Sequence, residues 1–300
     1  MTVHISRSDH ARTMETCLDV PRQKPSFPIA LPEVGISGKT VWVRLPEGTI
    51  PFAAILEVSL AAETRGIHMS RLEEVISALY ARDFVDLRDY ALALGREMLN
   101  RQGAEQGRVR LRGQLPILRT AAASGHHSLD SMEVGVDLHL VGGGKESSLL
   151  FGVGVNHITA CPCTQAYNQV LFNREGANPL PLATHSQRAH TRLQLGACGL
   201  SPSLPELRGC LEKALHVTQD LLKRPDEAEL VFRSHAAPQF AEDAVREVAR
   251  QVGLDFGGRL PPATPVRIES LSFESIHIHD VCCRLSTTLA EICRLLPELP

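Results

Sequence analysis

An alternating stretch near the middle of the chain limits most strongly what the chain can fold into. Between Met132 and Leu140 every second residue is hydrophobic, and the residues between them are polar or glycine. Successive side chains of a β-strand point to opposite faces, so this period of two predicts a strand with one buried face. The chain is therefore expected to contain a β-sheet.

Similar alternation, together with helical periods, divides the chain into two halves. Each half is predicted to run strand-strand-helix-helix-strand-strand, although no residues match between the halves. The predicted strands are Thr40–Arg44, Phe52–Ala62, Arg108–Leu118 and Met132–Leu140, then Leu149–Val155, Gln187–Leu195, Val266–Phe273 and Val281–Thr288. Residues 1–35 are polar, contain four prolines and show no period, which predicts a flexible lead-in before modules at 36–145 and 146–300.

Capping and breaking residues delimit the predicted helices. A helix is expected from near Met69, because Ser70 and Glu73 have the spacing of a capping box. Another is expected over residues 203–222, where Pro225 would end it. The remaining two are expected between Asp86 and Gly103, and over Phe240–Val252 with Phe240, Ala244, Val245 and Val248 facing inward.

Charge and hydrophobicity exclude several classes of protein. The net charge of -3 leaves no basic excess for general binding to nucleic acid or to a membrane surface. No hydrophobic run approaches the ~20 residues of a membrane span, and no secretory signal is visible at the N-terminus. The eight cysteines are scattered, unlike those of a disulfide scaffold. We therefore expect a cytoplasmic protein with reduced thiols.

Two thiols and an imidazole lie within the segment from Asn156 to Arg188. Cys161 and Cys163 form a Cys-Pro-Cys, and His185 follows later. Such soft donors suit a divalent metal, but they are too few for a closed structural zinc site. Missing ligands would come from elsewhere, or one position would stay open for water, as catalysis requires. The alternative is two buried cysteines and a hydrogen-bonded histidine.

Three further polar clusters have both functional and structural interpretations. In Glu274-Ser-Ile-His277-Ile-His279 the two histidines would share a face, with Glu274 on the other, if the segment is extended. They would then be metal ligands or proton shuttles, or else belong to a polar hairpin or a solvated strand face. Arg65, His68 and Arg71 surround a helix start, which favours an anion site or an ordinary cap. Glu227 and Glu242 are carboxylates near helix ends, where solvated acids are common.

Together these motifs resemble those of type IB GTP cyclohydrolase I, the prokaryotic enzyme of folate and 7-deazapurine biosynthesis. They occur in the family's order between Arg65 and His279: Arg65-Gly-Ile-His68-Met-Ser-Arg71, Cys161-Pro-Cys163, His185-Ser-Gln-Arg188, Lys223-Arg-Pro-Asp-Glu227, Phe240-Ala-Glu242-Asp and Glu274-Ser-Ile-His277-Ile-His279. The resemblance implies an α+β bimodular tunnelling fold, with antiparallel sheets and helices on one face. It also implies a homotetramer with active sites at subunit interfaces.

The resemblance also implies roles for individual residues. Cys161, His185 and Glu227 would hold a divalent metal, which could be Zn, Mn or Fe. Cys163 would be a reactive thiol at the substrate, and Glu242 would anchor the guanine edge. The remaining implied residues are Glu274, His277 and His279 at the reacting end, and Arg65, His68, Arg71 and Arg188 for the triphosphate. Which of Glu227 and Glu242 meets the metal stays open.

The implied reaction is hydrolysis of GTP to 7,8-dihydroneopterin triphosphate and formate, through attack of a metal-activated water on guanine C8. The sequence departs from the family's pattern at Ala160, at Ile278 and in a longer loop between Cys163 and His185. None of these changes removes an implied catalytic side chain. Two alternatives are another tunnelling-fold enzyme of purines or pterins, such as an NADPH-dependent nitrile reductase, and a non-catalytic metal- or nucleotide-binding protein.

Overall fold

The computed structural model describes residues 5–172, 180–196, 201–220 and 223–296. Within these residues nine strands form one sheet, with β7 paired to β5 beside the path β1-β2-β3-β4-β5-β6-β8-β9. All pairings are antiparallel. The strands are β1 (Leu31–Leu45), β2 (Gly48–Leu60), β3 (Gly107–Thr120), β4 (His127–Val141), β5 (Glu146–Ala160), β6 (Ser186–Gly196), β7 (His216–Val217), β8 (Pro265–Ser272) and β9 (Val281–Thr288).

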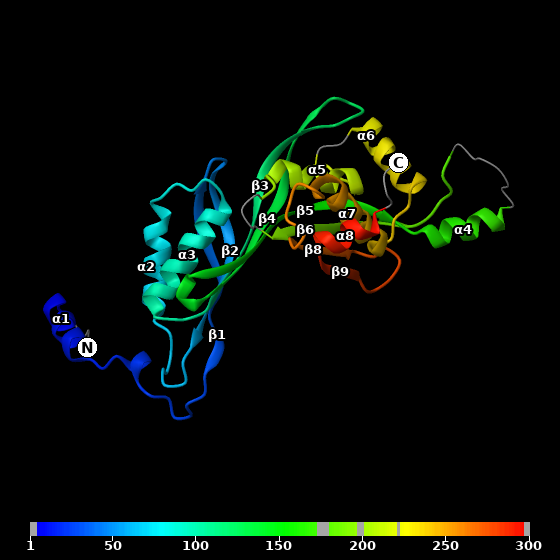
Figure 1. The fold of residues 1–300 in the computed structure, drawn as a ribbon. Coiled ribbons are helices and arrows are strands. Elements are labelled where there is room, and N and C mark those ends of the chain that lie inside the picture. The colour runs from blue at the N-terminus through cyan, green and yellow to red at the C-terminus, as the bar shows by residue number, and fades with distance from the viewer. Residues whose placement is uncertain (1–4, 173–179, 197–200, 221–222, 297–300) are drawn as a thin grey trace.

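The helices gather over the two halves of this sheet. Helices α2 and α3 cover the first half, and α5, α7 and α8 cover the second, while α1 and α4 lie at opposite ends of the elongated molecule (Figure 1). Their bounds are α1 (Arg7–Thr16), α2 (Met69–Tyr80), α3 (Leu87–Gln102), α4 (Pro162–Leu171), α5 (Leu204–Ala214), α6 (Arg224–Ala236), α7 (Ala241–Phe256) and α8 (Leu289–Leu295). In the described part of the chain, no helix is long and hydrophobic enough to cross a membrane.

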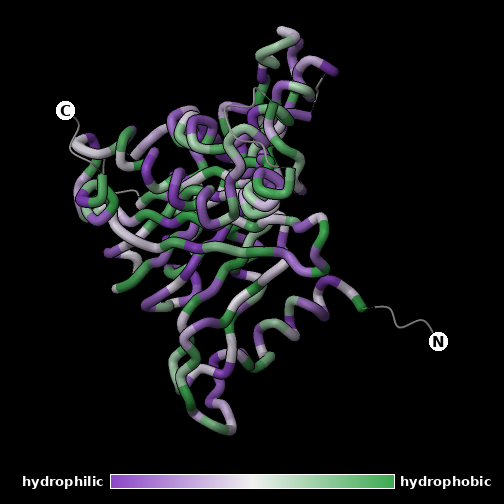
Figure 2. Tube along the Cα trace, turned by 90° about the vertical axis from the view of Figure 1, so that its right-hand side faces the viewer, coloured by the Kyte–Doolittle hydropathy of each residue, from purple (hydrophilic) through white to green (hydrophobic). Residues whose placement is uncertain are grey.

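One hydrophobic face runs through both halves because β4 pairs with β5. The register places Val136 opposite Phe151, and Leu193 of β6 opposite Ile268 of β8. These side chains are buried against the helices in a single core cluster. Hydrophobic and hydrophilic residues alternate along the strands (Figure 2). The alternation that predicted the Met132–Leu140 strand therefore marks the face that the helices cover.

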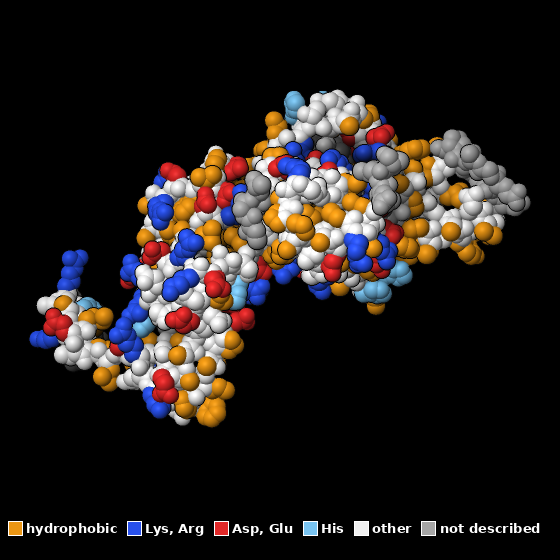
Figure 3. Space-filling model, viewed as in Figure 1, with side chains coloured by type: hydrophobic (Ala, Val, Ile, Leu, Met, Phe, Trp, Pro, Cys, Tyr) orange, Lys and Arg blue, Asp and Glu red, His pale blue; other side chains and the backbone are white. Residues whose placement is uncertain are grey.

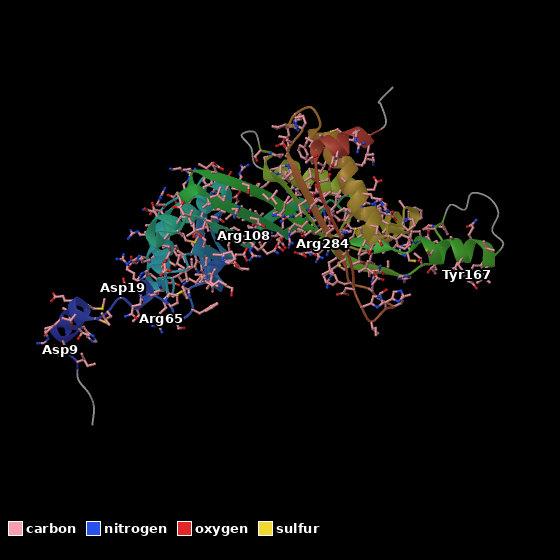
Figure 4. All side chains as sticks on the ribbon, turned by 60° about the horizontal axis from the view of Figure 1, so that its bottom comes forward. Asp9, Asp19, Arg65, Arg108, Tyr167 and Arg284 are labelled. Carbon is pink, nitrogen blue, oxygen red and sulfur yellow. The ribbon has the colours of Figure 1, made fainter. Side chains whose placement is uncertain are left out.

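The opposite face of the sheet carries paired charges. Arg192 contacts Glu133 at 2.5 Å and Glu269 at 3.1 Å, which ties β6 to β4 and β8. Arg108 and Arg284 also belong to this charged face (Figure 4). Burial works to raise the pKa of Glu133, but hydrogen bonds from His190 and Arg192 outweigh it and lower that pKa to about 2. Glu133 is therefore ionised at neutral pH.

The predicted strands and their order are confirmed, and most are longer than expected. Asp86 caps α3 by accepting from the N–H groups of Arg88 and Asp89, and Gly103 adopts the left-handed conformation at its end, with φ of 66°. The predicted cap at Ser70 is wrong. His68 is the N-cap of α2, without a side-chain cap, so Ser70 lies inside the first turn.

The helix expected over residues 203–222 is wrong in its extent. The capping box of Ser203 with Glu206 is present, but α5 ends at Ala214, and Leu222 lies outside the described residues. Pro225 lies in the first turn of α6 instead of ending a helix, because a first-turn residue needs no N–H for the helical ladder. The expected inward position of Phe240 is also wrong, since this N-cap residue is exposed.

Helices α1, α4, α6 and α8 were not predicted. In the lead-in, Ser6 and Asp9 form a complete capping box for α1, none of whose residues is buried. Its sequence therefore lacks the hydrophobic stripe by which a packed helix is recognised.

Candidate active site

Cys161 and His185 meet where β5 ends and β6 begins. Cys161 is the N-cap of α4, and His185 comes directly before β6. The backbone N–H of Cys161 donates to the carbonyl oxygen of His185 at 3.1 Å. The hydroxyl of Thr184 donates to the carbonyl oxygen of Cys161 at 2.6 Å. The sheet therefore brings together two residues that lie on either side of a long loop.

The surroundings of the Cys161 thiol favour its ionised form. Burial works to raise its pKa, but hydrogen bonds from Thr164, the N–H of Cys163 and the His185 ring outweigh burial and lower the pKa below the usual value. The hydroxyl of Thr164 lies 3.7 Å from the sulfur. A thiolate at a helix N-terminus can act as a nucleophile or a metal ligand. Cys163, in the first turn of α4, is exposed and therefore accessible to a bound substrate.

Gln187 connects His185 to Glu274 and was not predicted as a site residue. Its amide oxygen lies 3.1 Å from Nδ1 of His185, and its amide nitrogen donates to Oε1 of Glu274 at 3.2 Å. Ser272, the last residue of β8, donates its hydroxyl to the same carboxylate oxygen at 2.9 Å. Residues two apart on an extended segment share a face, so the position of Gln187 beside His185 was a signal in the sequence.

His277 and His279 lie in the loop between β8 and β9. Their rings stack with centroids 5.4 Å apart, and the ring of His277 lies 6.0 Å from that of His185. Both side chains are exposed, and histidines gather on the lower surface of the second half (Figure 3). The two histidine rings lie side by side, but not for the predicted reason. The extended segment that would have placed them opposite Glu274 is not formed, because these residues bend instead of forming a strand.

Glu242 lies near the same sheet edge, in the first turn of α7. The carbonyl oxygen of Gln239, just before this helix, accepts from the N–H of Ala160 at 3.2 Å. The pKa of the Cys283 thiol on β9 is raised, mainly by burial and secondly by the negative charge of Glu242. Glu242 is exposed and therefore free to meet a ligand.

Glu227 lies at the other end of α6 from the cysteine–histidine pair. The carbonyl oxygen of His235, in the last turn of α6, accepts from Gln165 of α4 at 2.7 Å. Eight residues of helix separate His235 from Glu227, a rise of about 12 Å. Neighbouring Asp226 is buried and accepts from the N–H groups of Ala123 and Ser124.

The donor set of one chain fits part of a metal site. Cys161 and His185 are in contact and supply sulfur and nitrogen ligands of the kind that zinc and iron take. Among the residues that the structure describes, no three His, Cys, Asp or Glu side chains converge on one point.

Three of the four candidate triphosphate residues lie far from Cys161 in the same chain. Arg65 is at one end of the molecule, while Tyr167 of α4 is at the other (Figure 4). Next to Arg65, His68 and Arg71 line a cavity of about 1080 Å³ between α2 and the lead-in. Arg188 lies apart from them on β6, with its guanidinium 5.9 Å from the ring centroid of Phe273. The structure brings Arg188, but not the other three, to the sheet edge of Cys161.

Comparison with known proteins identifies the family. The model of "Type I GTP cyclohydrolase folE2" matches residues 17–283. The chain belongs to this family. It is 30% identical to GTP cyclohydrolase MptA 2 of Methanocella arvoryzae, over 91% of this chain and 97% of that protein. It is also 30% identical to GTP cyclohydrolase FolE2 of Cupriavidus pinatubonensis, over 87% of this chain and 90% of that protein.

Solved structures support the fold of this GTP cyclohydrolase family member. Uricase from Arthrobacter globiformis has a TM-score of 0.50 and 10% identity, covering 87% of this chain and 93% of that chain. A hyper-thermostable mutant of AgUricase has a TM-score of 0.52 and 8% identity, covering 87% and 91%. The α+β tunnelling fold implied by the motifs is therefore confirmed. The motifs also predicted the GTP cyclohydrolase family correctly.

Proposed function

We propose that this chain is a type IB GTP cyclohydrolase that converts GTP and water to 7,8-dihydroneopterin triphosphate and formate. The observation that carries the proposal is that Cys161, His185, Glu274 and His277 lie at one sheet edge, joined by pairwise contacts through His185 and Gln187. Membership in the folE2 family and the names of its MptA and FolE2 relatives support the choice of substrate.

The residues at this edge divide into metal-holding and proton-moving groups. Cys161 and His185 would hold a divalent metal (Zn, Mn or Fe), which would supply Lewis acidity and lower the pKa of a water molecule. His277 or His279 would protonate the guanine nitrogen that departs when the C8–N bond breaks. The accessible thiol of Cys163 would contact the substrate, with Glu274 beside it at the reacting end.

Substrate binding would use the remaining polar residues. Glu242 would accept hydrogen bonds from the guanine edge, because a carboxylate matches its two N–H donors. Arg65, His68, Arg71 and Arg188 would bind the triphosphate through charge-assisted hydrogen bonds. A second hydrolysis would release C8 as formate, and the opened ribose would rearrange and close onto the freed amine.

The proposed site requires more than one copy of the chain. Arg65 and Cys161 cannot meet within one copy, since Arg65 lies far from Tyr167 of α4, the helix whose N-cap is Cys161. A homotetramer with sites at subunit interfaces would let one copy's residues 65–71 face another copy's Cys161. Glu227 is the proposed third metal ligand and would likewise reach the pair from a second copy. The proposal includes modules at 36–145 and 146–300 and a cytoplasmic location.

The decisive experiment is to incubate metal-reconstituted protein with GTP and to measure formate and pterin fluorescence. We expect both products, and we expect a chelator to abolish them. If GTP binds but no formate forms with Zn²⁺, Mn²⁺ or Fe²⁺, the proposal fails and a nucleotide-binding protein is the better description. Whether the product enters folate or 7-deazapurine synthesis is a separate question for genetics.

A further inference from the structure

Gln187 lies between two proposed functional groups and hydrogen-bonds to both. Its amide oxygen faces Nδ1 of His185 at 3.1 Å, and its amide nitrogen donates to Glu274 at 3.2 Å. Ser275 donates its hydroxyl to the amide oxygen at 3.4 Å. The side chain is partly buried. Each end of the amide therefore has a partner of the matching hydrogen-bonding character.

The amide determines which nitrogen of His185 carries the ring proton. An amide oxygen only accepts hydrogen bonds, so Nδ1 must be the donor. Nε2 then keeps its lone pair, which is the form that binds a metal or accepts a proton. Outer hydrogen bonds of this kind orient histidine ligands in metal sites.

The other end of the amide orients Glu274. Oε1 of this carboxylate accepts from Gln187 and from the hydroxyl of Ser272. Ser272 is itself buried and shares a hydrogen bond of 3.0 Å with Thr159 of β5. The carboxylate is thus anchored to the sheet on one side and to Gln187 on the other.

We propose that Gln187 is a positioning residue that holds His185 in the Nδ1–H tautomer and Glu274 in its orientation. The functional consequence rests on the proposed function, but the tautomer follows from the hydrogen bond alone. The first test therefore needs no activity. In metal-free protein with ¹⁵N-labelled histidine, His185 should show the Nδ1–H tautomer at a pH where the ring is neutral. Gln187→Met should convert it to a mixture.

The matched control is Gln194→Met, a buried glutamine near the other end of the same strand. A merely structural effect would disturb both variants alike, whereas the proposal predicts that only Gln187→Met changes the His185 spectrum. An Nε2–H tautomer in the unsubstituted protein, or an unchanged spectrum in Gln187→Met, overturns the proposal. This holds whether or not the protein turns over GTP.

Measurements of metal binding and of turnover distinguish the effect of the Gln187–His185 hydrogen bond from that of the Gln187–Glu274 hydrogen bond. Gln187→Met should weaken Co²⁺ binding about 10–100-fold, as loss of an outer hydrogen bond to a histidine ligand does. Gln187→Glu keeps the acceptor for His185 but replaces the donor to Glu274 with a second carboxylate. It should bind Co²⁺ within about a few-fold of the unsubstituted protein, because a changed charge at a partly exposed position has a small effect. Its kcat should be lower. Equal losses in both variants contradict separate roles.

The lead-in carries a second inference from an independent set of contacts. The carbonyl oxygen of Pro21 accepts from the backbone N–H groups of Arg65 and Gly66, at 3.0 and 3.2 Å. Two adjacent N–H groups on one oxygen form the arrangement that binds a phosphate oxygen. Pro21 therefore occupies donors that a phosphate group would use.

Two side chains of the same segment contact the side chains of Arg65 and His68. Oε1 of Gln23 accepts from Nη1 of Arg65 at 3.4 Å, and Oδ1 of Asp19 lies 3.6 Å from Nε2 of His68. Three oxygens of residues 19–23 thus contact residues that we propose bind the triphosphate. Phosphate oxygens and these protein oxygens cannot occupy the same donors at once.

We infer that residues 19–23 form a strap that covers the triphosphate site and must move for GTP to bind. This inference rests on the proposed role of Arg65, His68 and Arg71. Only molecules in which the strap is open can bind GTP. The apparent affinity for GTP is therefore the intrinsic affinity multiplied by the fraction of open molecules. The Asp19 contact is partly exposed, so its expected effect is modest.

Inorganic triphosphate is the probe, with binding measured by calorimetry on the full-length chain. The double variant Asp19→Asn with Gln23→Ala should bind it about two- to five-fold more tightly. Glu15→Gln, an exposed change on α1, should bind as the unsubstituted protein does. Arg71→Ala should weaken binding. Weakening by Arg71→Ala without tightening in the double variant overturns the strap alone. No effect of Arg71→Ala overturns the triphosphate site and the strap with it.

Discussion

The backbone N–H of Cys161 donates to the carbonyl oxygen of His185 at 3.1 Å, at the point where β5 ends and β6 begins. This hydrogen bond fixes the two residues side by side through the main chain. Their side chains can therefore be changed without loss of the backbone geometry. The pairing of β5 with β6 holds the edge of the sheet in place when either side chain is removed.

Replacing Cys161 or His185 with alanine should lower kcat/KM for GTP by about 10³-fold or more, because each removes a group of the proposed metal site. Thermal unfolding should change little, since neither side chain belongs to the hydrophobic core. Steady-state formate release and a melting curve test both expectations. Cys282→Ala, an exposed thiol on β9, is the control and should retain activity. Near-normal turnover in either site variant would contradict the assignment.

Mixing two inactive variants tests whether the active site spans two copies. The two variants are Cys161→Ala and Arg71→Ala. Arg71 lies in α2 and Cys161 is the N-cap of α4, and these two helices lie far apart in the molecule (Figure 1). If one site uses Arg71 of one copy and Cys161 of another, co-assembled variants will contain some intact sites and regain part of the activity. Refolding the two proteins together and assaying formate measures this gain. Activity no higher than the separate variants would argue for a site within one chain.

Asp226 and Glu227 are adjacent, and we expect their roles to differ. Asp226 accepts from the N–H groups of Ala123, Ser124 and Lys223, so Asp226→Ala should lower the Tm. Glu227 is exposed, so Glu227→Gln should leave the Tm unchanged and weaken metal binding. Scanning calorimetry and metal competition compare the pair directly. If Glu227→Gln lowers the Tm and leaves the metal affinity unchanged, Glu227 is not a metal ligand.

Stability should fall in mild acid because of His157. Burial, and to a smaller extent the charges of His190 and His216, lower the pKa of His157 to about 3, from 6.5. The unfolded chain takes up a proton below pH 6.5, while the folded chain does not until about pH 3. The free energy of unfolding should therefore drop by about 1.4 kcal/mol per pH unit within this window. The full contribution is present above pH 6.5.

Urea unfolding at several pH values measures this slope. His157→Gln can keep a hydrogen bond to Thr191, which lies 2.7 Å from Nε2 of His157. The variant should lose most of the dependence between pH 6.5 and 5. If its pH dependence matches that of the unsubstituted protein, other groups cause the acid sensitivity.

Local patterns predicted the strands because the hydrophobic period depends only on which face of the sheet is covered. The same logic predicted α3, where Asp86 and Gly103 act within one turn of the helix. It failed at Pro225, because a proline is compatible with both the end of one helix and the start of the next. It also failed for α1 and α4, which bury none of their residues and so show no stripe.

The residue types of the site, their order and their resemblance to a family can all be read from the amino-acid sequence. Tertiary structure alone decided which of them meet. The antiparallel pairing of β5 with β6 joins Cys161 to His185, and the β8–β9 loop carries His277 to the same edge. Arg65 and Glu227 stay apart from them in one chain. Contacts between distant segments depend on the register and packing of the whole sheet, which no local spacing of residues encodes.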